Sequence, residues 1–338
     1  MMRSTVLLRS PRLFFVLLVG LLLGSILLAL NVGKYPLSPS QLWETISCSF
    51  SGQCQGNTEQ TVLWQIRLPR IFAACFVGAA LACAGATYQG MFKNPLVSPD
   101  ILGVSAGAGF GASLAIFYNL PMVYIQLFAF SGGILAVLCV SLIASRSHTQ
   151  DPILVLVLSG IAIGSLLGAG ISLLKILADP FTQLPSITFW LLGSLTAINQ
   201  QDLIQLIPML LIGIIPIFLL RWRLNLLSLD EDEAQTLGVP IKCTRWILIV
   251  FTTLCTASAV AMTGIIGWVG LLVPHIARLL VGANFIRLLP TSLLLGASFL
   301  LLTDTLARTI APIELPLGIL TSACGAPFFL YLLVRGQK

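Results

Sequence analysis

Few residues of this chain have the type and spacing needed for chemistry, and the clearest are an acid and a base inside an apolar stretch. Asp304 precedes Arg308 by four residues. On a helix these side chains share a face, and the acid-before-base order is the favourable one. An ionisable residue in an apolar segment of membrane length is a functional candidate by default. We expect Asp304 to neutralise and position Arg308, and we prefer this to a proton relay because no second buried acid accompanies it.

The sequence carries none of the common catalytic or nucleotide-binding signatures. It has no GxxxxGK[ST] loop for ATP phosphates, no HExxH and no GxSxG. Its two histidines, His148 and His275, lie far apart in sequence, and neither has a ligand set around it. We therefore predict no catalytic, cofactor-binding or metal-binding residue in this chain and no enzymatic activity of its own.

The composition indicates an all-α polytopic membrane protein. Hydrophobic residues make up 57% of the 338 residues and charged residues only 9%, against about 25% charged in a soluble domain. Apolar runs of about 20 residues, enough to cross the hydrocarbon core as a helix, recur along the chain. The net charge of +6 needs no nucleic-acid partner, because the Lys and Arg bias of loops facing the cytoplasm accounts for it. We expect residues 1–338 to form one transmembrane domain.

The apolar runs predict ten spans, and the Lys and Arg distribution places both ends of the chain in the cytoplasm. A cleavable signal peptide is an alternative for the first run, but that run is longer than a signal h-region and lacks a clear cleavage site. Spans two to five and seven to ten form two sets of four with opposite starting sides, so an inverted repeat is possible. The expected spans are Leu13–Leu30, Ile71–Gly90, Ile101–Tyr118, Val123–Ala144, Ile153–Leu177, Leu203–Leu220, Ile247–Thr263, Ile265–Val281, Leu288–Ile310 and Leu317–Val334.

This orientation assigns each of two polar stretches to one side of the membrane. Residues 33–66 form a periplasmic loop, and residues 221–245 form a cytoplasmic segment. Arg67, Arg70 and Arg308 fall on the outer side, against the positive-inside bias, and require a separate reason. Cys48 and Cys54 lie in the outer loop, where an oxidising compartment makes a disulfide as plausible as two free thiols.

The inner segment contains an acidic stretch that is typical of a short helix. Ser228 and Glu231 fit a capping box, acids crowd the first turn, and Gly238 is a natural stop. From the residues alone, a solvated loop and a docking helix for a cytoplasmic partner are equally supported.

Small residues recur every four positions in the fifth span, at Gly160, Gly164 and Gly168. Such spacing lets helix backbones approach closely, and close packing is the commoner outcome. The sharper hypothesis is that this face lines a passage for a bulky solute.

Several long motifs, in order, resemble the FecCD family, the permeases of type II ABC importers for iron–siderophores, haem and vitamin B12. The resemblance covers nearly the whole chain. The N-terminal motifs are Arg67-Leu-Pro-Arg70, Gly85-Ala-Thr-Tyr-Gln-Gly90, Lys93-Asn-Pro-Leu96 and Pro99-Asp-Ile-Leu-Gly-Val-Ser-Ala-Gly107. The C-terminal motifs are Gly264-Ile-Ile-Gly-Trp-Val-Gly-Leu-Leu-Val-Pro-His-Ile-Ala-Arg278, Asp304-Thr-Leu-Ala-Arg308, Glu314-Leu-Pro-Leu-Gly318 and Gly325-Ala-Pro-Phe-Phe329.

The resemblance implies a bacterial inner-membrane subunit that works by alternating access. Its partners would be a second permease copy (identical or related), two cytoplasmic ATPases that bind ATP and magnesium, and a periplasmic binding protein. Substrates in the family are mainly metal chelates, and in a minority of permeases oxyanions such as molybdate or tungstate. An ion-coupled secondary transporter is the alternative class, and it would need buried acids, for which only Asp304 is a candidate.

The resemblance also assigns roles to residues. It implies that Arg67, Arg70 and Arg308 meet glutamates of the binding protein. It implies that the 228–238 stretch is a coupling helix in a cleft of the ATPase, with the residues Ser228, Asp230, Glu231, Asp232, Glu233, Ala234, Leu237 and Gly238. The fifth and tenth spans would line the pathway, with an inner gate near residues 145–151 that includes Ser145 and Ser147. The disulfide is not part of the family pattern.

Overall fold

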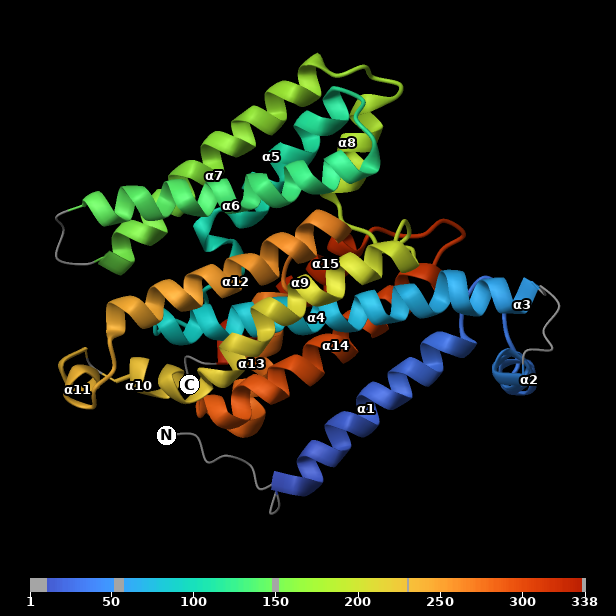
Figure 1. Cartoon of the computed structure of the whole chain (residues 1–338), viewed down its shortest axis with the longest axis horizontal. Helices are drawn as coiled ribbons and strands as arrows, with labels where there is room; N and C mark the ends of the chain where they lie inside the picture. The colour runs from blue at the N-terminus through green and yellow to red at the C-terminus, as the bar shows by residue number, and fades with distance from the viewer. Residues whose placement is uncertain (1–10, 52–57, 148–151, 230, 336–338) are drawn as a thin grey trace.

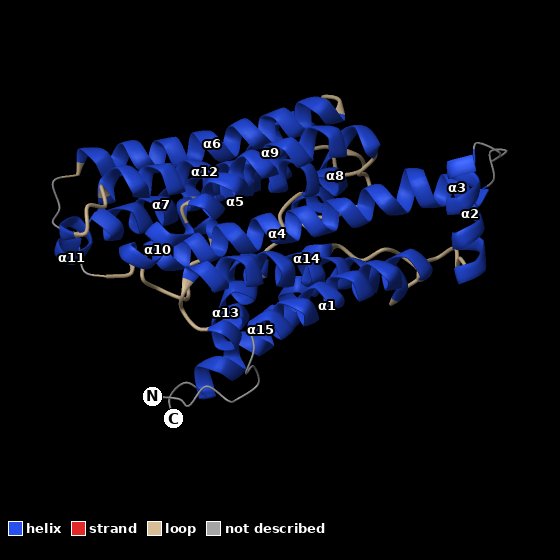
Figure 2. Cartoon of the chain, turned by 60° about the horizontal axis from the view of Figure 1, so that its bottom comes forward, coloured by secondary structure: helices blue, strands red, loops and turns tan. Residues whose placement is uncertain are grey.

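The structure of the chain, a computed structural model, describes residues 11–51, 58–147, 152–229 and 231–335. Within these ranges the regular structure is helical and no strand occurs (Figure 2). In this described part of the chain, seven helices are long and apolar enough to cross a membrane, and three shorter apolar helices accompany them. Each of the ten predicted spans overlaps one of these helices, so the all-α prediction is confirmed for the described residues. The number of helices that cross the membrane, their orientation and an inverted repeat stay predictions.

The helix boundaries follow the apolar runs. The seven long helices are α1 (Pro11–Asn31), α4 (Leu68–Met91), α6 (Met122–Arg146), α7 (Pro152–Leu177), α9 (Gln200–Leu219), α12 (Ile241–Thr263) and α14 (Phe285–Thr309). The three shorter ones are α5 (Val104–Phe117), α13 (Val269–Val281) and α15 (Leu317–Arg335). The remaining elements are α2 (Pro39–Ser51), α3 (Thr58–Thr61), a π-helical turn (Val62–Arg67), a 3₁₀ turn (Pro99–Leu102), α8 (Gln183–Leu191), α10 (Arg221–Leu227) and α11 (Glu231–Thr236).

Helix α4 is the central element of the bundle. It is buried over most of its length, and it packs against α14, α13, α12 and α9. Figure 1 shows α5, α6, α7 and α8 grouped on one side of it, with α14 and α1 on the other. Helix α7 is the least covered long helix, since only 6% of its most apolar stretch is buried in the chain.

Glycine pairs set the closest helix approaches. A Cβ added at Gly78 of α4 would lie 2.2 Å from the backbone oxygen of Gly296 in α14. A Cβ at Gly85 would lie 1.7 Å from the oxygen of Gly270 in α13. Backbones can approach this closely only where no side chain intervenes, which is the usual basis of helix association in lipid.

Three non-helical segments meet at the end of the bundle that carries α2 and α3. They are residues 192–199, residues 264–268 and residues 310–316. The Ser194 amide donates to the Thr263 oxygen at 2.7 Å, and the Leu317 amide donates to the Gly193 oxygen at 2.9 Å. Irregular backbone inside an apolar bundle must satisfy its polar groups internally, and these bonds join residues 192–199 to the helix ends that flank the other two segments. Helices α10 and α11 lie at the opposite end (Figures 1 and 2).

Candidate functional site

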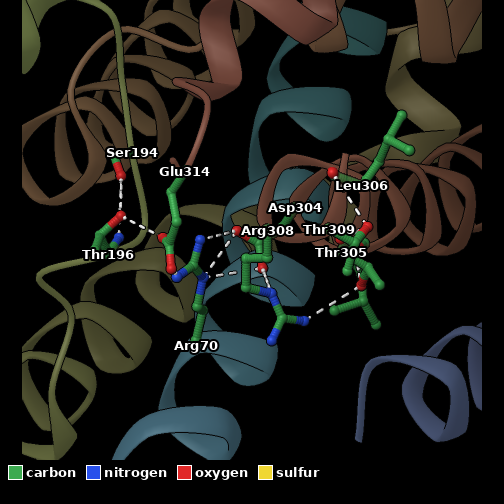
Figure 3. A network of polar contacts seen from close by, with 10 residues as sticks. Arg70, Ser194, Thr196, Asp304, Thr305, Leu306, Arg308, Thr309 and Glu314 are labelled. Carbon is green, nitrogen blue, oxygen red and sulfur yellow. Dashed lines mark hydrogen bonds and ion pairs between the residues drawn. The ribbon is translucent and has the colours of Figure 1, made fainter. Parts of the chain in front are cut away.

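The candidate site is built around Asp304, whose carboxylate is fully buried in α14. Arg70, in the first turn of α4, holds it from across the helix interface. The Arg70 Nε lies 3.0 Å from both carboxylate oxygens of Asp304, and Nη2 lies 2.9 Å from Oδ1. A guanidinium that engages a carboxylate through two nitrogens forms a strong and directional pair (Figure 3).

Arg308 approaches the same carboxylate from one helical turn further along α14. Its Nε lies 3.3 Å from Asp304 Oδ2, and its Nη2 lies 3.5 Å from the Thr305 hydroxyl. The predicted pairing of Asp304 with Arg308 is therefore confirmed. The sequence did not reveal that Asp304 is shared with Arg70.

Glu314 extends the cluster into the loop between α14 and α15. Its Oε2 accepts from Arg70 Nη1 at 2.8 Å and from the Thr196 hydroxyl at 3.1 Å. Partial burial alone would raise the pKa of the Glu314 carboxyl, but the hydrogen bond and charge of Arg70, assisted by Thr196, hold this pKa below its usual value. We refer to Arg70, Asp304, Arg308 and Glu314 as the ionic cluster; through Thr196 it joins α4, α14 and two loops (Figure 3).

Arg67 lies beside the ionic cluster but binds backbone instead of a carboxylate. Its guanidinium donates to the carbonyl oxygens of Leu30 and Tyr35. It thereby fastens the end of α1 and the following loop to the turn that precedes α4. A Cβ placed at Gly33 would be within 3.0 Å of Arg67 Nη2 and 3.6 Å of Arg308 Nη1, which places the two guanidinium groups near each other.

The three arginines predicted to dock a partner are all buried within the chain. Arg67 is 3% exposed, Arg70 6% and Arg308 7%. Their nearest partners are internal, so direct contact with a docked protein would require these side chains to move or the partner to reach inward. Three arginines face two carboxylates here, and the resulting net positive charge favours approach of an acidic surface even without direct contact. Docking itself stays a prediction.

A cavity of about 680 Å³ adjoins the ionic cluster. Ser194, Thr196 and Glu314 contribute polar groups to its wall, and Phe189 and Trp190 contribute aromatic ones. The cavity lies where the turn from α5 to α6, α8 and the non-helical loops converge. Movement of the loop that carries Glu314 would therefore change both the cluster and the cavity.

The acidic segment at the other end is partly as expected. Helix α11 covers Glu231–Thr236, and Gly238 ends it with φ of +79°, so the predicted short helix with its glycine stop is confirmed. The predicted capping box, with Ser228 as the N-cap, is wrong. Ser228 ends α10, and its hydroxyl donates to the Leu224 oxygen at 3.1 Å. This happens because the chain is already helical before the acidic stretch begins.

Exposure divides the coupling residues into two groups. Asp232, Glu233, Leu237 and Gly238 are exposed, whereas Ala234 is 1% exposed and packs into the core. Asp230 lies outside the described residues, as does the side chain of Glu231. The exposed acids are accessible to a partner, and their role in coupling stays a prediction.

The three glycines of α7 do not form one uniform face. A Cβ at Gly160 would meet the Ile101 oxygen at 2.0 Å, so this position is in close packing. Gly164 has only the Ala106 Cβ at 4.0 Å, and Gly168 has nothing within 4 Å. The close-packing interpretation therefore fits Gly160, and the open end at Gly168 is compatible with a passage or a second chain.

The remaining predicted positions are only partly described. Ser145 donates to the Leu142 oxygen at 2.9 Å, and Ser147 follows the end of α6; residues 148–151 of the predicted gate lie outside the described residues. Cys48 is disulfide-bonded, but Cys54 lies outside the described residues, so their pairing stays a prediction. In the described part of the chain, no group of three His, Cys, Asp or Glu residues is placed to hold a metal ion.

Sequence reasoning missed the roles of Glu314 and Thr196. Glu314 belongs to a recognisable motif, and a lone acid beside Leu-Pro-Leu could have suggested a partner for one of the outer arginines. Thr196 has no comparable signal, because its hydroxyl meets Glu314 only when two distant loops come together.

Comparison with known proteins agrees with this architecture. The profile of the FecCD transport family matches residues 20–335. A molybdate import system permease protein of Haemophilus influenzae is 41% identical over 332 residues, which cover 96% of this chain and 97% of the relative. An iron chelatin transport system permease protein of Helicobacter pylori is 42% identical and covers 87% of this chain and 90% of its own length. A solved structure of a metal-chelate type ABC transporter in an inward-facing conformation superposes with a TM-score of 0.87 at 39% identity, covering 96% of this chain and all of that one.

Proposed function

The chain belongs to the FecCD transport family and is a permease subunit of an ABC importer, and on that premise we propose that it carries a metal chelate from a periplasmic binding protein to the cytoplasm. The family match over residues 20–335 is the observation that carries this proposal. The chelate would be of the iron–siderophore, haem or cobalamin type. Transport would proceed by alternating access in the bacterial inner membrane.

The assembly we propose contains two copies of this chain, two ATPases and a binding protein. Residues 1–338 form one membrane domain of ten spanning helices with both ends in the cytoplasm. The ATPases bind ATP and magnesium and contact the segment around α11. The binding protein docks at the opposite end, where Arg67, Arg70 and Arg308 supply net positive charge.

A second candidate substrate is an oxyanion such as molybdate or tungstate. It is favoured by the molybdate permease of Haemophilus influenzae, which is 41% identical over nearly the whole of both chains. Oxyanions and many ferric chelates are both anionic, so the positive charge of the cluster does not separate these two candidates. The binding protein would select between them.

An ion-coupled secondary transporter is less well supported. Such a transporter needs an acid that is free to bind and release its ion. Asp304, the buried acid that sequence analysis considered, is held by Arg70 on one side and by Arg308 on the other.

Reconstitution tests the proposal directly. The chain is purified together with a partner ATPase and a binding protein and placed in proteoliposomes with ATP inside. Uptake of labelled ferric siderophore, haem, cobalamin and molybdate is then compared. We expect ATP-dependent uptake of a chelate that requires the binding protein. Uptake of molybdate alone would select the second candidate, and uptake that follows an ion gradient without ATP would overturn the importer mechanism.

A further inference from the structure

A pair of asparagines joins the inner segment to the start of α14. The Asn225 Nδ2, on α10, donates to the Asn284 Oδ1 at 3.1 Å. The Asn225 Oδ1 accepts from the backbone N–H of Phe285 at 2.7 Å. Asn284 is the N-cap of α14, and its Oδ1 also accepts from the Ile286 N–H at 2.9 Å. One side chain of α10 is thus bonded both to the cap of α14 and to its first residue.

Apolar packing buries the contact between α10 and the start of α14. Leu224 and Leu227 of α10 are 0% and 2% exposed, and they belong to the same core cluster as Phe285 and Leu288 of α14. That cluster also contains Ala234 of α11. A displacement of α11 is therefore transmitted by direct packing to α10 and the beginning of α14.

Helix α14 connects its contact with α10 to the ionic cluster. Asn284 and Asp304 are 20 positions apart in the numbering, which corresponds to about 30 Å along a helix. At its outer end, α14 supplies both Asp304 and Arg308 to the cluster. The same element thus begins at the segment proposed to contact the ATPase and ends at the site proposed to face the binding protein.

Helix α4 runs alongside α14 and also has a contact at each end, one with the ionic cluster and one with the segment of α10 and α11. It carries Arg70 at its outer end, and just beyond its inner end the Lys93 Nζ donates to the Leu229 oxygen between α10 and α11. The two helices touch backbone to backbone at Gly78 and Gly296. Packed interfaces of this kind do not deform continuously, so α4 and α14 are suited to move as one pair.

Resting on the proposed function, we propose that Asn225 and Asn284 are positioning residues that transmit movement of the ATPase-contacting segment through α14 to the ionic cluster. The bond fixes α10 to the N-terminus of α14, so that a shift of one is followed by the other. The pair does not touch substrate or nucleotide. Its effect is expected in the coupling between the two ends of the molecule.

Two substitutions of equal charge test this junction. Asn284→Asp keeps an oxygen for Asn225 Nδ2 and remains a good N-cap. Asn225→Asp keeps the acceptor for the Phe285 N–H but loses the donor, and it sets an oxygen against Asn284 Oδ1. Asn284 could donate to that oxygen only by turning its amide, which would remove its own cap bond to Ile286. Both variants add one negative charge near the same helix N-terminus, where the dipole favours it.

The readout is the outer end of α14 in the reconstituted complex with its ATPase. Ile310, which follows α14 and is 58% exposed, is replaced by Cys, and the exposed cysteines Cys139, Cys243 and Cys324 are replaced by Ser. Labelling by a membrane-impermeant maleimide is followed with and without Mg-ATP. This measurement does not require the substrate to be known.

We expect Mg-ATP to change the labelling rate in the parent chain and in Asn284→Asp. In Asn225→Asp the response should fall about fivefold, the change that loss of one neutral hydrogen bond makes in an equilibrium constant. Copurification of the ATPase and the thermal midpoint should stay near the parent values. Equal labelling responses in the two variants, or no response in the parent chain, would overturn the proposed role of Asn225 and Asn284. Failure of the proposed function is seen separately, as an intact labelling response without ATP-driven uptake of any probe.

Discussion

Asp304 and Arg70 are 234 positions apart in sequence, yet the Arg70 Nη2 lies 2.9 Å from Asp304 Oδ1 in the interior of the bundle. The pair closes the contact between α4 and α14 at the end opposite to α10 and α11. Because Arg308 shares the same carboxylate, one acid holds two arginines that would otherwise repel each other. The pair therefore fixes the geometry of this end of the bundle.

Replacing Asp304 with Asn should destabilise the chain strongly. The substitution leaves Arg70 and Arg308 adjacent and removes the carboxylate between them. Breaking a buried ion pair by removing one partner costs about 3–5 kcal/mol. The thermal midpoint of the purified chain in detergent, measured by fluorescence, checks this expectation.

Glu314→Gln is the matched control for Asp304→Asn. It removes a carboxylate from the same arginine, but the Glu314 side chain is 26% exposed, and solvent-accessible pairs contribute about 1 kcal/mol or less. A loss as large as that of Asp304→Asn would contradict the assignment of Asp304 as the central acid.

Acid should weaken the loop between α14 and α15 through Glu314. Its pKa is lower in the folded chain than its usual value, because Arg70 outweighs the effect of partial burial. The stabilisation is therefore present above the unfolded pKa of about 4.3 and is lost as the pH falls through the lower, folded value. The difference in thermal midpoint between the parent chain and Glu314→Gln should shrink below about pH 4. A difference that is constant from pH 3 to pH 7 would argue against this ion pair.

Gly78→Ala should disturb the contact between α4 and α14. The added methyl group would lie 2.2 Å from the Gly296 oxygen, and backbone atoms cannot yield as a flexible side chain can. Overpacking of this kind costs about 1–3 kcal/mol. Thermal unfolding in detergent measures the loss.

The control for Gly78→Ala is Gly24→Ala in α1, where an added Cβ has nothing within 4 Å. This substitution should be neutral or slightly stabilising, because Ala is favoured over Gly in a helix. Equal effects at the two positions would show that helix propensity, and not the close backbone approach, determines the result.

Gly168→Trp should leave the chain folded and block transport. Nothing in the chain lies within 4 Å of a Cβ at this position, so the added ring meets no internal neighbour at its base. If the open end of α7 faces the passage or the second copy, uptake in proteoliposomes should fall about tenfold, the effect of about 1.4 kcal/mol on a rate.

Leu166→Trp places the same ring on the opposite face of α7, at a residue that is 67% exposed. Uptake in this variant should match that of the parent chain. Normal uptake in Gly168→Trp would remove the pathway interpretation, whereas loss of the folded chain would show that the position is packed after all.

The sequence by itself determined the class of this protein and most of its elements. Apolar runs too long and too numerous for a soluble core dictated helices in a membrane, because backbone polar groups in lipid must be satisfied within the helix. The four-residue spacing of Asp304 and Arg308 determined their pairing, and Gly238 determined where α11 ends, since a left-handed position favours glycine. Each of these features depends on neighbours within one or two helical turns.

Only the tertiary structure decided what the three arginines predicted to dock a partner touch. The sequence predicted that Arg67, Arg70 and Arg308 meet a docked partner, but folding buries all three, one on backbone carbonyl groups and two on Asp304. The partners of Arg70 lie more than 230 positions away, and no local pattern encodes such a meeting. The same holds for Asn225 and Asn284, whose bond exists because the packing of α10 against α14 brings the two amides together. Local sequence sets periodicity and helix ends, whereas the burial of a charge and the choice of its partner follow from how the helices pack.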